Sequence, residues 1–531
     1  MPSSILNTRI PALRNQALIG VALFVAGIAA AWEAAGFVSE GDLRSLEFIA
    51  LAFVVCAGVV ATLRNWRTGF LLFFLMMLFE DLPRKYLGNV TALFFGKDVL
   101  LAIVYIAFFI QVRQRREKMF HPPFLLFLLF FIWLGALQIF SPNSPHIFYG
   151  LLGFKLYFYY VPLLYLGYAY IRSDEELRKF LVLNAVLAGA IGGLGIAQSI
   201  LGHQFLNPEQ LAPELEDLGA LYKSTPLTHQ EFYLPNSVFV STGRFSIFLV
   251  VALILALATT GYLLLNARRG RTIVLISTAI IGVAVLVSGS RGAAVGAGLS
   301  AAVLCAGFLW GAPWRWRQAH RLVRAIRHSI LIAALGLAAL VLLFPQEAGS
   351  RLDFYTETLN PNSSAYELSY RTWDYPLLNL LKAFENPNWV LGNGIGTASL
   401  GSQYVAKFIG QRPPGLWVEN GYGVLILEMG IIAPFLWVLW TGALVYYSWK
   451  VVRRLRQTRL FPIAFGIFWW AFFLLVPQTF GGLFSYQNYV CNAYLWLLVG
   501  VLFRLPDLLT AVPQTASISP ARRGQKGGFE F

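Results

Sequence analysis

Charged residues are scarce in this sequence. They make up 13% of its 531 residues, whereas 57% are hydrophobic, and the mean hydropathy is +0.62. Soluble proteins usually carry about 25% charged residues, so the composition excludes a large soluble helical protein. Apolar runs of nearly twenty residues recur from residue 17 to residue 503. We therefore predict an all-α, polytopic integral membrane protein with about 14 transmembrane helices.

Cysteine and histidine are also rare. Cys56, Cys305 and Cys491 lie in or beside apolar runs, and their spacing indicates neither a disulfide nor a metal site. The six histidines form no cluster of ligands in the sequence. We predict that the protein needs no metal and no cofactor. The first twenty residues lack a small-residue cleavage pattern, which favours a retained span over a signal peptide.

Basic residues outnumber acidic ones, 41 to 26, for a net charge of +15. Most of them lie in alternate short connections between apolar runs, which is typical of cytoplasmic loops. This placement predicts that both termini are cytoplasmic and argues against a nucleic-acid partner. The predicted spans cover residues 17–37, 46–63, 69–80, 91–111, 124–140, 150–171, 179–201, 244–266, 272–288, 292–311, 328–345, 420–446, 460–477 and 488–503.

Two connections on the opposite, outer side are long, at residues 202–243 and 346–419. In the second, Ser364 and Glu367 have the spacing of a capping box, which predicts a short helix through Arg371.

Pro376 is expected to interrupt this helix, after which apolar residues recur at helical spacing. The stripe predicts either an interfacial helix or a helix packed on the core of its own loop. Its members are Leu377, Leu380, Leu381 and Phe384.

Three arginines are candidates for binding an anion on the outer side. Arg244 lies at the outer end of a predicted span, and Arg291 lies in the tight turn Ser-Gly-Ser-Arg-Gly at 288–292. Glycines and serines in such a turn allow close backbone approach, and a guanidinium binds phosphate through two hydrogen bonds. The alternative for each is an interfacial arginine that reaches toward water.

Arg371 is the third arginine, and a glycine-rich segment at 392–396 follows it. The glycine pattern is superficially similar to a dinucleotide-binding loop, but no strand precedes it, so we reject that interpretation. A flexible loop that closes over a site and a plain turn both remain open.

A carboxylate marks the start of predicted span 420–446. Glu419 is positioned either as a general base, whose pKa partial desolvation raises, or as a carboxylate favoured by the helix dipole. Asn420 follows it directly. His229 in the first outer loop is the other candidate base, and Lys155 lies close to an outer span end.

The order of these motifs resembles the O-antigen ligase and polymerase superfamily. The resemblance covers residues 235–445 and rests on Arg244, the turn at 288–292, the large outer loop and the segment starting at Glu419. The stretch 141–168, with Gly150, Lys155 and Tyr160, is also similar to bacterial polysaccharide polymerases.

The resemblance implies a metal-independent glycosyltransferase of GT-C-like fold in the bacterial inner membrane. It would polymerise undecaprenyl-diphosphate-linked oligosaccharides at the periplasmic face, among membrane lipids and other polysaccharide-assembly proteins. By this resemblance Arg244, Arg291 and Arg371 bind the diphosphate. Ligases usually carry histidine where this chain has Glu419, which favours a polymerase. The alternatives are a ligase that transfers glycan to lipid A core or protein, and a transporter or flippase of lipid-linked sugars.

We predict four regions along the chain. Residues 1–243 form an N-terminal transmembrane bundle with the first outer loop, and residues 244–446 form the ligase-like core. Residues 447–511 form the last transmembrane helices. Residues 512–531, rich in Ser, Gln, Gly and basic residues, are predicted to be a disordered cytoplasmic tail.

Overall fold

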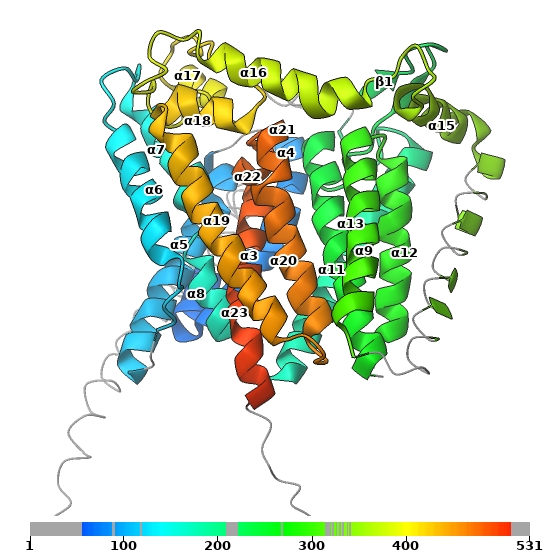
Figure 1. Ribbon diagram of the computed structural model, residues 1–531, viewed down its shortest axis with the longest axis horizontal. Helices are drawn as coiled ribbons and strands as arrows, with labels where there is room; N and C mark the ends of the chain where they lie inside the picture. The colour runs from blue at the N-terminus through cyan, green and yellow to red at the C-terminus, as the bar shows by residue number, and fades with distance from the viewer. Residues whose placement is uncertain are drawn as a thin grey trace, which may run out of the picture. The chain divides into compact units, whose positions relative to one another are not determined.

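The structure is a computed structural model that describes most of the chain (Figure 1). The described residues are 56–87, 91–116, 119–208, 221–266, 269–313 and 341–510, with scattered residues between 320 and 338. Predicted span 17–37, most of span 46–63, part of span 328–345, and the predicted tail 512–531 lie outside them. The chain divides into two compact units, one of residues 1–76 and 95–116 and the other of residues 77–94 and 117–531.

Eight helices among the described residues are long and apolar enough to cross a membrane, which makes this a multi-pass membrane protein. They agree with predicted spans in position. They are α5 (Thr91–Arg115), α7 with α8 (Ile147–Phe158 and Leu163–Tyr170), α9 (Asp174–Leu201), α11 (Thr242–Asn266), α13 (Arg291–Gly311), α19 (Ile432–Arg454), α20 with α21 (Phe461–Leu475 and Pro477–Gly481) and α23 (Tyr489–Thr510).

Three other predicted spans correspond to shorter apolar helices, α3 (Trp66–Phe79), α6 (Leu125–Gln138) and α12 (Arg271–Val287). The 14 residues of α3 and of α6 rise only about 21 Å, less than the roughly 30 Å of a hydrocarbon core. The predicted count of about 14 spanning helices is therefore not reached among the described residues.

Helix α11 forms the centre of the larger unit. Its sequence is apolar on all sides, a pattern typical of a helix buried within a bundle. Most of its side chains are buried, from Phe245 to Leu265, and it packs against α9, α12, α13 and α20. Large aromatic side chains fill the rest of this core, including Trp437, Trp470 and Trp496, which are all fully buried.

The prediction of one continuous span over 420–446 is wrong. The segment breaks at Gly430 into α18 (Gly421–Met429) and α19. Gly430 has a φ of +80°, and a Cβ there would lie 2.3 Å from the Val390 carbonyl oxygen. A residue with a side chain would be strained at this position, so the break depends on glycine.

The large loop at 346–419 is well ordered into helices. It contains α15 (Pro345–Leu359), the π-helical turn η1 (Tyr370–Asp374), α16 (Tyr375–Ala383) and α17 (Ser402–Phe408). Helix α16 lies across the ends of the spanning helices, with α15 near it (Figure 1). We call this side of the larger unit the α16 face.

The capping-box prediction is wrong, because the helix begins at Leu368 and not at Ser364. The Glu367 side chain pairs with arginines instead of capping. Pro376 does not interrupt the helix either. A single π-helical turn precedes it, which is the form in which the rare π-helix mostly occurs within α-helices.

One side of α16 packs and the other is open. Pro376 and Ala383 are buried, and Ala383 approaches Gly423 of α18. Leu377, Leu381 and Phe384 are exposed. The stripe is therefore not packed on the core of its own loop, which favours the interfacial alternative.

The remaining elements are short. Strands β1 (Tyr222–Ser224) and β2 (Glu231–Tyr233) form an antiparallel hairpin in which Lys223 pairs with Phe232. It is a small addition to the predicted all-α fold. Helix α4 (Asp81–Leu87) follows α3, and α22 (Phe484–Gln487) precedes α23.

Candidate functional site

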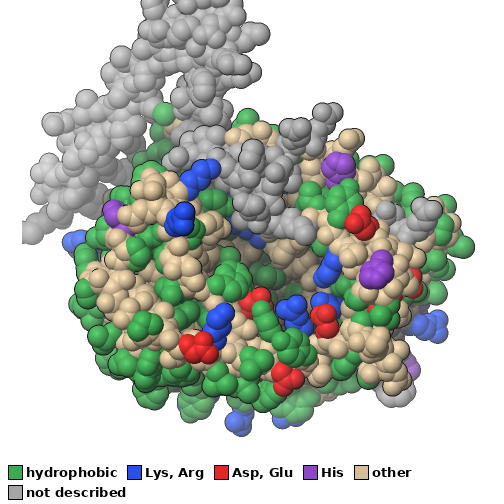
Figure 2. All heavy atoms as spheres, turned by 90° about the horizontal axis from the view of Figure 1, so that it is seen from above, with side chains coloured by type: hydrophobic (Ala, Val, Ile, Leu, Met, Phe, Trp, Pro, Cys, Tyr) green, Lys and Arg blue, Asp and Glu red, His purple; other side chains and the backbone are tan. Residues whose placement is uncertain are grey.

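A pocket of about 250 Å³ opens between the first turns of α11 and α13. Its wall includes Thr242 and Gly243 of α11 and Ser290 and Arg291 of α13, together with Lys223 of the hairpin. We call it the α11–α13 pocket. In Figure 2, which views the α16 face from above, Lys and Arg side chains (blue) and Asp and Glu side chains (red) lie together around a hollow.

Two helix N-termini meet at this pocket. Ser290 caps α13 by accepting a hydrogen bond from the Ala293 N–H at 3.3 Å, and Ser241 accepts one from the Arg244 N–H at 3.3 Å. The remaining N–H groups of a first helical turn have no partner within the helix and carry partial positive charge. Together with Arg291 and Lys223, they favour an anionic ligand.

The tight turn predicted at 288–292 is shorter in the structure: it covers 288–290 between α12 and α13, and Arg291 and Gly292 already belong to α13. Gly289 has a φ of +66°, and a Cβ there would lie 2.4 Å from the Leu234 side chain. Glycine at this position therefore allows the close approach that brings Arg291 to the pocket wall.

Helix α15 supports the pocket from behind. The buried Phe354 ring lies 4.4 Å from the Lys223 Nζ and 5.1 Å from the Arg291 Cζ, measured from its centroid. Arg351, which is also buried, donates to the Val287 carbonyl at 3.1 Å and to the Tyr233 carbonyl at 2.6 Å. It therefore ties the end of α12 to the hairpin.

Lys223 is the titratable amine of the pocket. Burial lowers its pKa to about 8, and the charges of Arg291 and Arg371 act in the same direction, while Glu367 opposes them. The amine is therefore charged near neutral pH and loses its charge under mildly basic conditions.

Anion binding should weaken as this amine deprotonates. We expect the affinity for a diphosphate diester, whose charge is fixed, to fall about tenfold between about pH 7 and about pH 9.5. Binding to protein in nanodiscs, followed by calorimetry, measures this. Lys223→Arg should flatten the pH profile, because arginine stays charged. If the affinity of the wild-type protein does not change over this pH range, Lys223 has no role in binding the anion.

Two of the three predicted arginines lie close together. Glu367 Oε2 is 3.0 Å from the Arg291 Nη1 and 3.6 Å from the Arg371 Nε. Arg371 also lies over the Tyr375 ring, with its Cζ 4.9 Å from the centroid. The carboxylate therefore joins a guanidinium of the pocket wall to one of the large loop.

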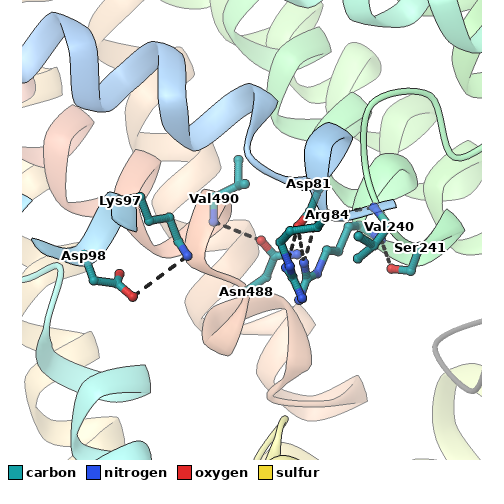
Figure 3. A network of polar contacts seen from close by, with 9 residues as sticks. Asp81, Arg84, Lys97, Asp98, Val240, Ser241, Asn488 and Val490 are labelled. Atoms are coloured by element: carbon teal, nitrogen blue, oxygen red, sulfur yellow. Dashed lines mark hydrogen bonds and ion pairs between the residues drawn. The ribbon is translucent and has the colours of Figure 1, made fainter. Parts of the chain in front are cut away.

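Arg244 is held elsewhere. Its Nη1 donates to both carboxylate oxygens of Asp81, at 3.0 and 2.8 Å. Arg84 Nη1 donates to the same carboxylate at 2.6 Å, and the Val240 N–H does so at 3.3 Å (Figure 3). Arg244 belongs to the first turn of α11, which lines the pocket. Its guanidinium, however, is part of an ion-pair cluster around the fully buried Asp81 carboxylate.

Lys85 extends this cluster. It is fully buried, and its Nζ donates to the Ser237 carbonyl and to the Asn236 Oδ1 at 3.1 Å. Figure 3 also draws the buried pair of Lys97 and Asp98 in α5, whose charged atoms are 3.9 Å apart.

The structure places Glu419 and Asn420 outside the pocket wall. Glu419 is partly exposed, and its N–H donates to the Asn379 Oδ1 in α16 at 3.1 Å. Asn420 is fully buried and caps α18, accepting from the Gly423 N–H at 3.0 Å and donating to the Phe480 carbonyl at 2.8 Å. These contacts give Asn420 a structural role.

The other predicted residues do not line the pocket either. His229 is exposed in the turn of the hairpin, with a φ of +54°. Lys155 lies partly buried in α7. Among the residues that the structure describes, no group of three or more His, Cys, Asp and Glu side chains is arranged to hold a metal ion.

The glycine-rich segment 392–396 is a packing element and not a flexible lid. All of its residues are buried, and Gly396 has a φ of +90°. Glu428, also fully buried, fixes the segment that follows, accepting hydrogen bonds from the Ala398 N–H at 3.0 Å, the Ser399 hydroxyl at 2.6 Å and the Tyr157 hydroxyl at 2.8 Å.

Gly396→Ala should destabilise the protein. A Cβ at this position would lie 2.0 Å from the Tyr149 carbonyl oxygen, and the positive φ adds strain. We expect a loss of at least about 2 kcal/mol in the free energy of unfolding, seen as a lower melting temperature in detergent. Gly298→Ala is the control, since no atom lies within 4 Å of its added Cβ. Equal melting temperatures for the two variants would contradict the tight packing.

Several residues of the site were missed in the sequence. The pair of Asp81 and Arg84 could have been predicted from the sequence, because opposite charges three residues apart directly follow an apolar run. No sequence pattern indicated the roles of Lys223 and Arg351, since their contacts join segments far apart in the chain. Comparison of the chain with protein-family models, curated proteins and solved structures finds no match.

Proposed function

We propose that this protein is a glycosyltransferase that polymerises oligosaccharide units carried on undecaprenyl diphosphate. The observation that carries the proposal is the α11–α13 pocket, where two helix N-termini, Arg291 and Lys223 surround one space. Backbone N–H groups, a guanidinium and an ammonium are together the groups that bind phosphate in proteins. The glycan and the carrier enter the proposal from the family resemblance.

The size of the pocket suits a head group. Its volume of about 250 Å³ is below the about 300–1,000 Å³ of pockets that enclose drug-sized ligands. A diphosphate in this space would leave the polyprenyl chain and the sugars outside it.

In the proposed reaction, an acceptor hydroxyl attacks the anomeric carbon of the donor sugar. The bond from that carbon to the diphosphate oxygen breaks, and the lipid diphosphate leaves with its electron pair. Fixed positive groups stabilise the charge that develops on the leaving oxygen without reorganising. Arg291 and Lys223 are the proposed groups. Glu419, which lies outside the pocket wall, enters as the proposed base for the hydroxyl proton from the family resemblance alone.

The distribution of charge supports placing the α16 face outside the cytoplasm. At the opposite ends of the helices, basic residues recur where chain segments connect, as the positive-inside rule describes for cytoplasmic loops. In the larger unit these include Arg172, Arg178, Arg271, Arg453, Arg454 and Arg504. We propose the bacterial inner membrane as the location, with the pocket on the periplasmic side.

Deleting the gene and separating the cell-surface glycan by electrophoresis tests the proposal. A polymerase predicts loss of the long ladder, with one repeat unit left on the acceptor. Complete absence of attached glycan, with lipid-linked polymer accumulating, would instead indicate a ligase. An unchanged ladder would contradict both activities.

A further inference from the structure

Glu367 is placed to control the charge of the α11–α13 pocket. It precedes the helix that begins at Leu368, and its Oε2 lies between the guanidinium groups of Arg291 and Arg371, at 3.0 and 3.6 Å. The side chain as a whole is 40% exposed, but Oε2 itself is buried. Only Arg291 of this trio lines the pocket, so Glu367 acts on the pocket from beside its wall.

Three positive groups and one negative group influence one another here. Arg291, Arg371 and Glu367 each act electrostatically on Lys223. When Lys223 is protonated, it carries one positive charge, as do Arg291 and Arg371. The negative charge of Glu367 reduces the net charge of the four groups to +2. Interactions between charges at a protein surface are weakened by solvent but still distinguish ligands that differ by one unit.

The substrate and the product of the proposed reaction differ in charge. A lipid diphosphate bound to sugar is a diester with two negative charges. The lipid diphosphate released is a monoester, whose terminal phosphate gains a further charge above about pH 6. Without Glu367, the two positive charges of the pocket wall and the nearby Arg371 would hold this product more tightly than the substrate, and product release commonly limits turnover.

We infer that Glu367 is a specificity-determining residue that matches the pocket to a dianionic diphosphate diester and disfavours the trianionic monoester. The inference rests on the proposed function. Glu367 achieves this by cancelling one positive charge, and discrimination by an opposing charge is a general means of rejecting a competing ligand.

Calorimetry on protein in nanodiscs, near pH 7.5, tests the inference with two soluble probes. Dimethyl diphosphate, with one methyl group on each phosphate, is the dianion, and methyl diphosphate is the trianion. Glu367→Gln should raise the affinity for the trianion about tenfold and for the dianion about threefold. Glu367→Asp keeps the charge and should keep the wild-type preference.

Asp374→Asn is the matched control, because it removes one negative charge from an exposed position of η1. It should leave both affinities unchanged, and a gain equal to that of Glu367→Gln would overturn the inference. A lower or evenly raised affinity in Glu367→Gln, with an unchanged melting temperature, would overturn it as well. If the wild-type protein binds neither probe, the result would overturn both the inference about Glu367 and the anion site on which the proposed function rests.

Discussion

Replacing Arg291 with alanine is expected to lower the rate of polymer formation about 10²- to 10³-fold while leaving the protein folded and inserted. Arg291 lines the α11–α13 pocket, and its partners are the partly exposed Glu367 side chain and the Phe354 ring. Neither contact is part of the buried core of α11, so the cost in stability should be small. Loss of one fixed donor to a developing oxyanion typically lowers kcat about 10²- to 10³-fold.

The measurement is polymer length and rate with purified protein and a lipid-linked repeat unit. Arg412→Ala removes an exposed arginine from the same large loop and should retain full activity. Arg291→Lys should be intermediate, because an ammonium keeps the charge but loses the planar fork. Full activity in a folded Arg291→Ala protein would remove Arg291 from the mechanism.

Neutralising Asp81 should cost far more stability than neutralising Arg291 or Glu367. The Asp81 carboxylate is fully buried and accepts hydrogen bonds from both Arg84 and Arg244. Asp81→Asn leaves two guanidinium groups without their counter-ion, and breaking a buried ion pair in this way costs about 3–5 kcal/mol. We expect a markedly lower melting temperature and less protein in the membrane.

A double variant distinguishes two causes of the lost stability, the broken ion pair and a local packing defect. Arg244→Gln in the Asp81→Asn background removes one of the uncompensated charges and should recover part of the lost stability. Asp374→Asn, which is exposed, should melt like the wild type. Strictly additive losses in the double variant would show that Asp81 and Arg244 do not stabilise each other.

Hydropathy predicted the spanning helices well because their burial depends on composition. Helix α11 is apolar on every side, so its sequence alone indicated a membrane helix. The break at Gly430 was harder to predict, although glycine near the end of a helical pattern is a known stop signal. It depends on the Val390 carbonyl, which belongs to a segment forty residues earlier.

The site was predictable only in part. The turn at 288–292 and the start of α11 were identified because glycine, serine and arginine recur there at the ends of apolar runs. The partner of Arg244 was not, since Asp81 is 163 residues away. Arg351 and Phe354, which support the pocket, belong to helix α15 of the large loop. No local sequence pattern predicts where this helix lies relative to α12.

A structure of the protein in nanodiscs, with an undecaprenyl-diphosphate-linked oligosaccharide bound, tests the account most directly. We predict that the diphosphate lies in the α11–α13 pocket, against Arg291, Lys223 and the first turns of α11 and α13. Density for the diphosphate at any other place, with this pocket holding only solvent, would contradict it.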